Sequence, residues 1–305
     1  MTGIPAEITK PFARARRLEW WTLFWMGTVV TAMYFTMGSS QAMKSALIED
    51  VLSLVPAVTW LIAARLEPKD PTAKYPFGLV RVNSLAFLVS AVALTLVGAF
   101  LFYEGAKTLI AQEHPTVPPI ELFGQDVWLG WLMIAALAYS VVVPMTLGRM
   151  KLPIAEKLRD KVLHTDALMQ KADWQTGLAG ILGIVGIGFG LWWADSVAAL
   201  FIAVSILKDG FDNIRTAAAE LLDGAPRELE GSDISHEARR LETRLAARWP
   251  GATIRLRESG RYIFATIEGV AEPGELPFAS ELMGDDPAWR LGRIDFSPNG
   301  ANEVP

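Results

Sequence analysis

Long apolar stretches alternate with short polar segments over the first two thirds of the chain. A helix that crosses a bilayer needs about 20 mostly apolar residues. This pattern predicts six membrane spans. They are Trp20–Gly38, Ala46–Leu66, Ser84–Tyr103, Val127–Gly148, Trp174–Trp193 and Asp195–Leu207, the last continuing as an amphipathic helix.

The pattern changes after Pro226. Residues 232–251 have the period of an amphipathic helix, and two alternating stretches flank Gly260 as in a hairpin. A second helix is expected near 275–283 and a last strand near 289–298. The order helix, strand, strand, helix, strand predicts a small α+β domain of the ferredoxin-like type. The chain therefore divides into a cytoplasmic tail (1–18), a six-helix membrane domain (19–225) and a cytoplasmic α+β domain (226–305).

Basic residues orient the predicted spans. Lysine and arginine gather before the first span, between the second and third, and between the fourth and fifth, whereas the other loops carry few. The positive-inside rule then places both termini in the cytoplasm. Composition fits a protein of the cell (inner) membrane with the lipid bilayer as a partner: 51% of residues are hydrophobic and the mean hydropathy is +0.29.

Composition also narrows the function. The chain has no cysteine, which excludes disulfides and thiolate metal sites. The net charge of −5 gives no indication of a nucleic-acid partner. Ser-His-Asp sets, the HExxH motif and glycine-rich phosphate loops are not recognisable, so we expect neither an enzyme nor a prosthetic cofactor.

Acidic residues lie within two of the apolar spans. A carboxylate at bilayer depth is costly unless it is paired, hydrated or bound to a cation. Polar residues recur at intervals of three and four along the second and fifth spans, which places them on one face of each helix. The pattern predicts a site for a divalent metal between the two helices, formed by Asp50 and Asp173, with contributions from Ser53, Met169, Gln170 and Asp166.

Plainer interpretations of these residues stay open. Asp166 can be a helix-start carboxylate outside the membrane. Glu49 and Asp50 can lie at the membrane interface, and Asp173 can form a simple ion pair with Lys171.

Several segments resemble the cation diffusion facilitator family. The run "LHTDALMQKADWQTG" with the later "WAD" and "LLDGAP" is similar to the family's fifth and sixth spans. Residues 46–66 resemble its second span, "KYPFGLVRVNSLAFL" its following loop, and "YEGAKTL" the end of its third span. The resemblance covers nearly the whole chain.

The resemblance implies a homodimeric exporter of divalent transition metals that is driven by protons and works by alternating access. The family's four metal ligands match Ser53, Ala57, Met169 and Asp173, so one usual ligand remains. Oxygen donors favour harder cations such as manganese or iron(II), while a thioether softens the site, and the choice among Mn, Fe, Co, Ni and Zn stays open. The alternative is a relative that binds metal or a partner and regulates without transporting.

Other family positions have their own implications. Tyr75 and Leu79 stand where the loop usually carries histidines, so no accessory metal is expected there. Arg81 and Asp223 match an ion pair that holds the membrane halves of the dimer, although they can also be separate surface charges. His236 is the single histidine of the tail, which predicts dimerisation through packing without zinc.

Overall fold

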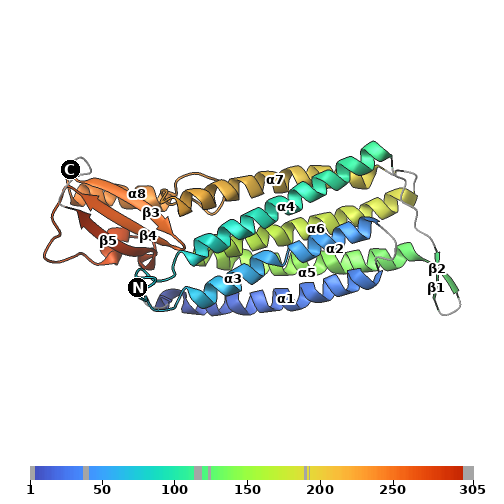
Figure 1. Cartoon of the computed structure of the whole chain (residues 1–305), viewed down its shortest axis with the longest axis horizontal. Helices are drawn as coiled ribbons and strands as arrows, with labels where there is room; N and C mark the ends of the chain where they lie inside the picture. The colour runs from blue at the N-terminus through green and yellow to red at the C-terminus, as the bar shows by residue number, and fades with distance from the viewer. Residues whose placement is uncertain are drawn as a thin grey trace.

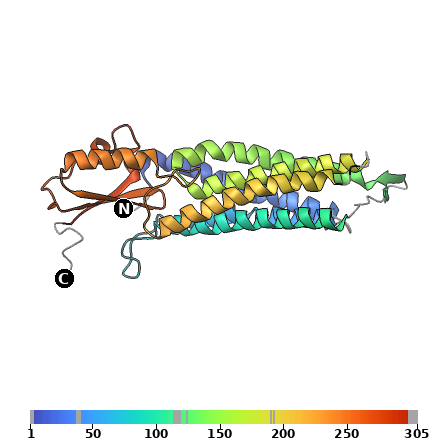
Figure 2. The same cartoon turned by 90° about the horizontal axis from the view of Figure 1, so that it is seen from above.

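A computed structural model describes residues 4–36, 41–112, 119–122, 125–188, 191 and 193–297. Long helices run side by side along the molecule, and a small α+β domain caps one end (Figures 1 and 2). The start of the first helix lies at this same end, while a short hairpin marks the opposite end (Figure 1). The helices of the bundle are α1 (Thr9–Thr36), α2 (Gln41–Leu52), α3 (Val55–Leu66), α4 (Val82–Ala111), α5 (Leu129–Leu158), α6 (Lys161–Gly188) and α7 (Ala194–Leu221). The hairpin is formed by β1 (Pro119–Leu122) and β2 (Gln125–Trp128).

Most of these helices are longer than the predicted spans. α1 begins well before Trp20, and α6 begins well before Trp174, because hydropathy marks only the apolar part of a helix. The predicted end of the first span at Gly38 lies outside the described residues, as do positions 189, 190 and 192 of the fifth span. By length and composition, two described helical stretches can cross a membrane, Leu47–Leu66 and Val82–Ala111.

The second predicted span is interrupted near its middle. α2 ends at Leu52, two residues form a turn, and α3 begins at Val55. Pro56 is the second residue of α3 and has no N–H to donate to the carbonyl of Leu52, which weakens the helix there. At the turn, the backbone N–H of Leu54 donates to the carbonyl of Val51, three residues earlier, at 3.3 Å.

α6 starts where a single side chain caps it. Oδ1 of Asp160 accepts hydrogen bonds from the backbone N–H groups of Val162 and Leu163, at 3.0 and 3.1 Å. An N-cap carboxylate satisfies the free amides of the first turn. This cap sets the register of the helix that carries Met169, Gln170 and Asp173.

α4 and α7 pack closely because glycines face the neighbouring helix. A Cβ atom at Gly98 would lie 3.0 Å from the backbone N of Leu207. At Gly210 it would lie 2.5 Å from Oγ1 of Thr95. Small residues that let backbones approach are characteristic of helix packing in membranes.

The C-terminal domain has the predicted order of elements. α8 (His236–Arg248) is followed by β3 (Thr253–Ser259), β4 (Tyr262–Glu268), α9 (Ala279–Met283) and β5 (Leu291–Ser297). β3 and β4 are antiparallel about the turn at Gly260, and β5 joins β4 in parallel, giving the sheet order β3-β4-β5. Leu241 and Leu245 of α8 pack on Ile263, Ala265 and Ile267 of the sheet.

Candidate metal centre

The first half of the candidate site lies at the end of α2. Glu49, Asp50 and Ser53 are all buried, with exposed fractions of 3%, 7% and 0%. The hydroxyl of Ser53 donates to the backbone carbonyl of Asp50 at 2.9 Å. Oε1 of Glu49 and Oδ2 of Asp50 have no hydrogen-bond partner among the described residues. These carboxylates therefore face the bundle interior.

The second half lies on α6. Met169, Gln170 and Asp173 are buried, and neither the carboxylate oxygens of Asp173 nor the amide atoms of Gln170 have a hydrogen-bond partner in the described part of the chain. Met169 packs among apolar residues of α4 and α7, including Leu94 and Ala203. Its side chain is therefore part of the apolar core.

The two halves are close enough to interact. The charges of Asp50 and Glu49 both act on Asp173, and Ser53 lies beside it. Three buried carboxylates from two helices thus share one region. Within the described residues, however, no three or more histidine or acidic side chains are grouped closely enough to hold a metal ion. The arrangement is an acidic region whose carboxylate oxygens lack partners among the described residues, and not a complete set of metal ligands.

Asp166 belongs to a different cluster. Its carboxylate accepts a hydrogen bond from Nζ of Lys151, which also donates to Glu19 at 3.1 Å. All three side chains are fully buried, and they come from α1, α5 and α6. Asp166 is therefore paired with the ammonium group of Lys151. No ion pair between Asp173 and Lys171 is present among the described residues, where Lys171 is exposed.

Sequence reasoning missed this cluster. Lys151 was counted among the basic residues of a loop, and Glu19 lies just before the first span. Their only signal was a charged residue bordering an apolar run, which is also the pattern of an ordinary interface residue.

Arg81 and Asp223 form an ion pair at the junction of the bundle and the tail. Arg257 of β3 joins the same carboxylate at 2.8 Å, so the pair connects the loop before α4, the end of α7 and the C-terminal domain. Asp223 has a left-handed backbone, with φ at 59°. The part that this pair plays in a dimer stays a prediction.

Around the junction lies a larger network of buried charges. Arg261 in the β3–β4 turn donates both to Glu67 at 2.9 Å and to Asp160 at 3.0 Å. Trp60 of α3 also donates to Asp160, at 2.8 Å. Burial raises the pKa of Glu67, and Arg261 opposes this shift. Burial lowers the pKa of Arg261, but Glu67 and Asp160 outweigh that effect and the net shift is upward.

A second group extends the network. Nζ of Lys161 contacts Glu220 at 3.4 Å and also donates to Glu258 of β3. Ser84 of α4 donates to Glu220 and accepts from the N–H of Gly260 at 3.0 Å. The sheet of the tail is therefore anchored to the ends of α3, α4, α6 and α7.

Tyr75 and His236 lie in the segments where the family usually carries accessory metal ligands. Tyr75 is half exposed and lies in a tight turn with Thr72. The backbone N–H of His236 donates to Glu228, so this residue begins α8 beside a carboxylate. Neither position belongs to a group of potential ligands within the described residues.

The helical bundle, which includes two helical stretches long and apolar enough to cross a membrane, matches a class of membrane proteins that transport cations. Residues 22–222 match the family described as "Cation efflux transmembrane domain". The chain therefore belongs to the cation efflux family, as the resemblance to cation diffusion facilitators implied.

Named relatives agree with this assignment. The chain is 24% identical over 185 residues to the manganese efflux system protein MneS of Bacillus subtilis, covering 61% of this chain and 60% of that one. It is 28% identical over 194 residues to a cadmium, cobalt and zinc/H(+)-K(+) antiporter of Bacillus velezensis, covering 62% and 56%. A probable cation efflux system protein of Mycobacterium tuberculosis is 26% identical over 253 residues, covering 80% and 69%. The chain thus spans about three fifths of the length of the first two relatives.

Proposed function

We propose that this protein exports a divalent transition-metal cation across the cell (inner) membrane in exchange for protons. The observation that supports it is the shared region of Asp50, Glu49 and Asp173, buried carboxylates whose oxygens lack partners in the described structure. Buried charges of this kind are costly unless a cation compensates them. The proposed fold has six spans, with both termini in the cytoplasm and two copies in the functional unit.

In this proposal the cation is held by Asp50 and Asp173. Glu49, Ser53 and Gln170 supply further oxygens, and Met169 lines the site. Two carboxylates balance the charge of a divalent ion. Oxygen donors favour manganese or iron(II) over zinc, which prefers imidazole and thiolate ligands.

Proton exchange follows from the same ligands. A carboxylate must lose its proton to bind a metal, so metal binding releases protons. When the site opens to the outside, proton uptake displaces the metal. Alternating access moves the same carboxylates between the two sides of the membrane.

Metal uptake into everted membrane vesicles tests the site. Manganese is the probe, and the vesicle lumen is acidic so that the proton gradient is directed outward. We expect Asp173→Asn and Asp50→Asn to reduce the uptake rate by at least about tenfold, because each removes one negative charge from the metal ligands. Asp70→Asn is the matched control, since Asp70 lies exposed in the loop before α4. Undiminished uptake by both site variants would refute the site.

Two observations favour a second function. Ser53, Ala57 and Met169 replace usual ligands, and no closed ligand cluster is found among the described residues. A protein that senses metal without moving it would bind manganese in an equilibrium assay and yet show no flux in proteoliposomes. Flux in the unsubstituted protein, abolished by Asp173→Asn, would exclude this alternative.

A further inference from the structure

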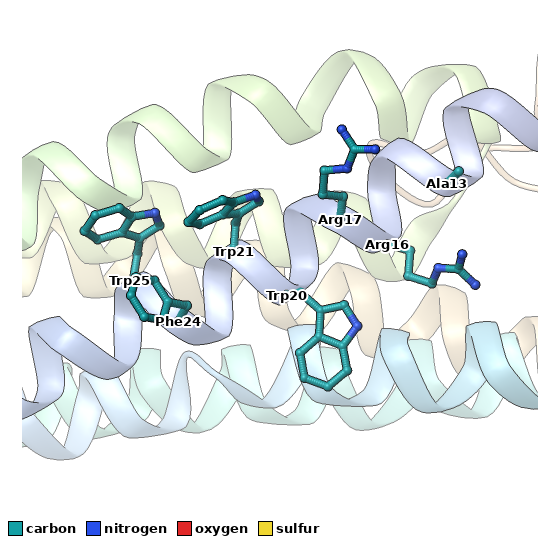
Figure 3. A pocket seen from close by; sticks show the side chains of 7 residues that line it. All are labelled: Ala13, Arg16, Arg17, Trp20, Trp21, Phe24 and Trp25. Carbon is teal, nitrogen blue, oxygen red and sulfur yellow. The ribbon is translucent and has the colours of Figure 1, made fainter.

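An open groove lies along the outer surface of α1. Its volume is about 690 Å³, and it is lined by two arginines followed by four aromatic residues. They are Arg16, Arg17, Trp20, Trp21, Phe24 and Trp25, all labelled in Figure 3. The arginines lie toward the beginning of α1 and the aromatic rings lie one and two turns further along (Figure 3).

The aromatic residues form a connected surface. Trp21 and Trp25 are stacked with ring centroids 6.1 Å apart, and Phe24 meets Trp25 edge-on at 5.1 Å. Trp20 is 62% exposed and Phe24 57% exposed. Such large rings on the outer face of a membrane helix contact lipid, and tryptophan prefers the depth of the headgroups.

The two arginines have no acidic partner in the part of the chain that the structure describes. Among the described residues neither Arg16 nor Arg17 forms an ion pair, although the chain has many. The nearest carboxylate in sequence is Glu19, which is buried and already bonded to Lys151. The groove therefore offers two free guanidinium groups beside an apolar wall.

The level of the groove in the membrane fits a lipid headgroup. From Arg17 to the end of α1 at Thr36 is about 28 Å at the rise of an α-helix. This is close to the thickness of the hydrocarbon core, about 30 Å. If α1 crosses the membrane, as proposed above, Arg16 and Arg17 lie at the level of the cytoplasmic phosphates, with the tryptophans just beneath.

We propose that this groove is a binding site for an anionic phospholipid. Arg16 and Arg17 hold the phosphate, because guanidinium groups match phosphate oxygens in geometry and charge. Trp20, Trp21, Phe24 and Trp25 hold the glycerol and the upper acyl chain. A second copy of the chain is a poorer occupant, because a twofold contact through this face would bring the arginines of the two copies together.

Lipid titration of the delipidated protein in a neutral detergent tests this proposal. The probes are phosphatidylglycerol and phosphatidylcholine with the same acyl chains, and bound lipid is counted by native mass spectrometry. We expect the unsubstituted protein to retain phosphatidylglycerol preferentially. The double variant Arg16→Gln/Arg17→Gln should retain it more weakly by on the order of tenfold, because each arginine contributes to the attraction.

The matched control is Lys10→Gln/Arg14→Gln. It removes the same charge from exposed positions of the same helix, outside the groove. Lipid binding within about twofold of the unsubstituted protein is expected for this control. An equal loss in both double variants would overturn the proposal in favour of a general surface potential.

Two further outcomes would also overturn it. Equal retention of the two lipids would show that the phosphate charge of an anionic lipid is not selected. A shift of the monomer–dimer ratio by Arg16→Gln/Arg17→Gln, with lipid binding unchanged, would assign this face to contact between copies. Neither result touches the metal site, so the test is independent of the transport assay.

Discussion

At the scale of single residues, buried charge dominates this molecule. Glu19, Lys151 and Asp166 form a fully enclosed ion cluster with one ammonium for two carboxylates. One oxygen of each carboxylate has no partner within the described structure. The desolvation of such a cluster is offset only while the ammonium stays in place. Lys151 is therefore the residue on which the packing of α1, α5 and α6 depends.

We expect Lys151→Met to destabilise the protein by about 3–5 kcal/mol, because two buried carboxylates lose their cation. Thermal unfolding in detergent, followed by tryptophan fluorescence, measures the loss. Lys157→Met is the control, since Lys157 is exposed on the same helix. The triple variant Glu19→Gln/Lys151→Met/Asp166→Asn should recover most of the loss. A stable single variant would contradict this account.

At the scale of elements, the break between α2 and α3 lies beside the candidate metal site. It lies at Ser53 and Leu54, less than one helical turn after Asp50. A straight helix would place Asp50 and Asp173 at different depths by residue counting. The break allows the end of α2 to take its own direction, and the two carboxylates interact in the folded protein. Interrupted helices at ion sites are a recurring device of membrane transporters.

Pro56→Ala should restore the missing backbone N–H and favour a continuous helix. We expect manganese uptake to fall severalfold while thermal stability is kept or increased. The chain has no cysteine, so spin labels at Ile48→Cys and Ile62→Cys can report the change in helix direction directly. Pro153→Ala in α5 serves as the proline control. An unchanged label distance together with unchanged uptake would contradict the role of the break.

At the scale of the whole molecule, the tail is joined to the bundle by buried ion pairs. Arg261 binds Glu67 after α3 and Asp160 before α6. These two helices continue toward the candidate metal site. The C-terminal domain therefore holds the end of α3 and the start of α6, two helices whose movement the proposed transport would require.

We expect Arg261→Leu to weaken the contact between the C-terminal domain and the bundle, because Glu67 and Asp160 would be left buried without a cation. Hydrogen exchange should increase at the end of α3, at the start of α6 and in the β3–β4 turn. Arg255→Leu is the matched control, since its pair with Glu268 is on the surface and contributes little. Equal exchange in the two variants would show that the network does not hold the domains together.

The bundle, the order of elements in the tail and the family could be predicted from the sequence. Hydropathy and periodicity are local properties, and they survive in any single helix or strand. Residue by residue, the acidic positions of the second and fifth spans were also recognisable. Their placement relative to one another could not be predicted, because it depends on the break at Ser53 and on the capped start of α6 at Asp160.

The sequence by itself determined which segments are apolar, where the tail begins and which polar residues share a helix face. Only the tertiary structure decided the partners of each buried charge. It directed Asp166 to Lys151, left Asp173 facing Asp50, and joined Arg261 to Glu67 across 194 positions of the chain. The physical reason is that the energy of a charge in a low-dielectric interior depends on the groups within a few ångströms, which stabilise or destabilise it. Those neighbours come from distant parts of the sequence.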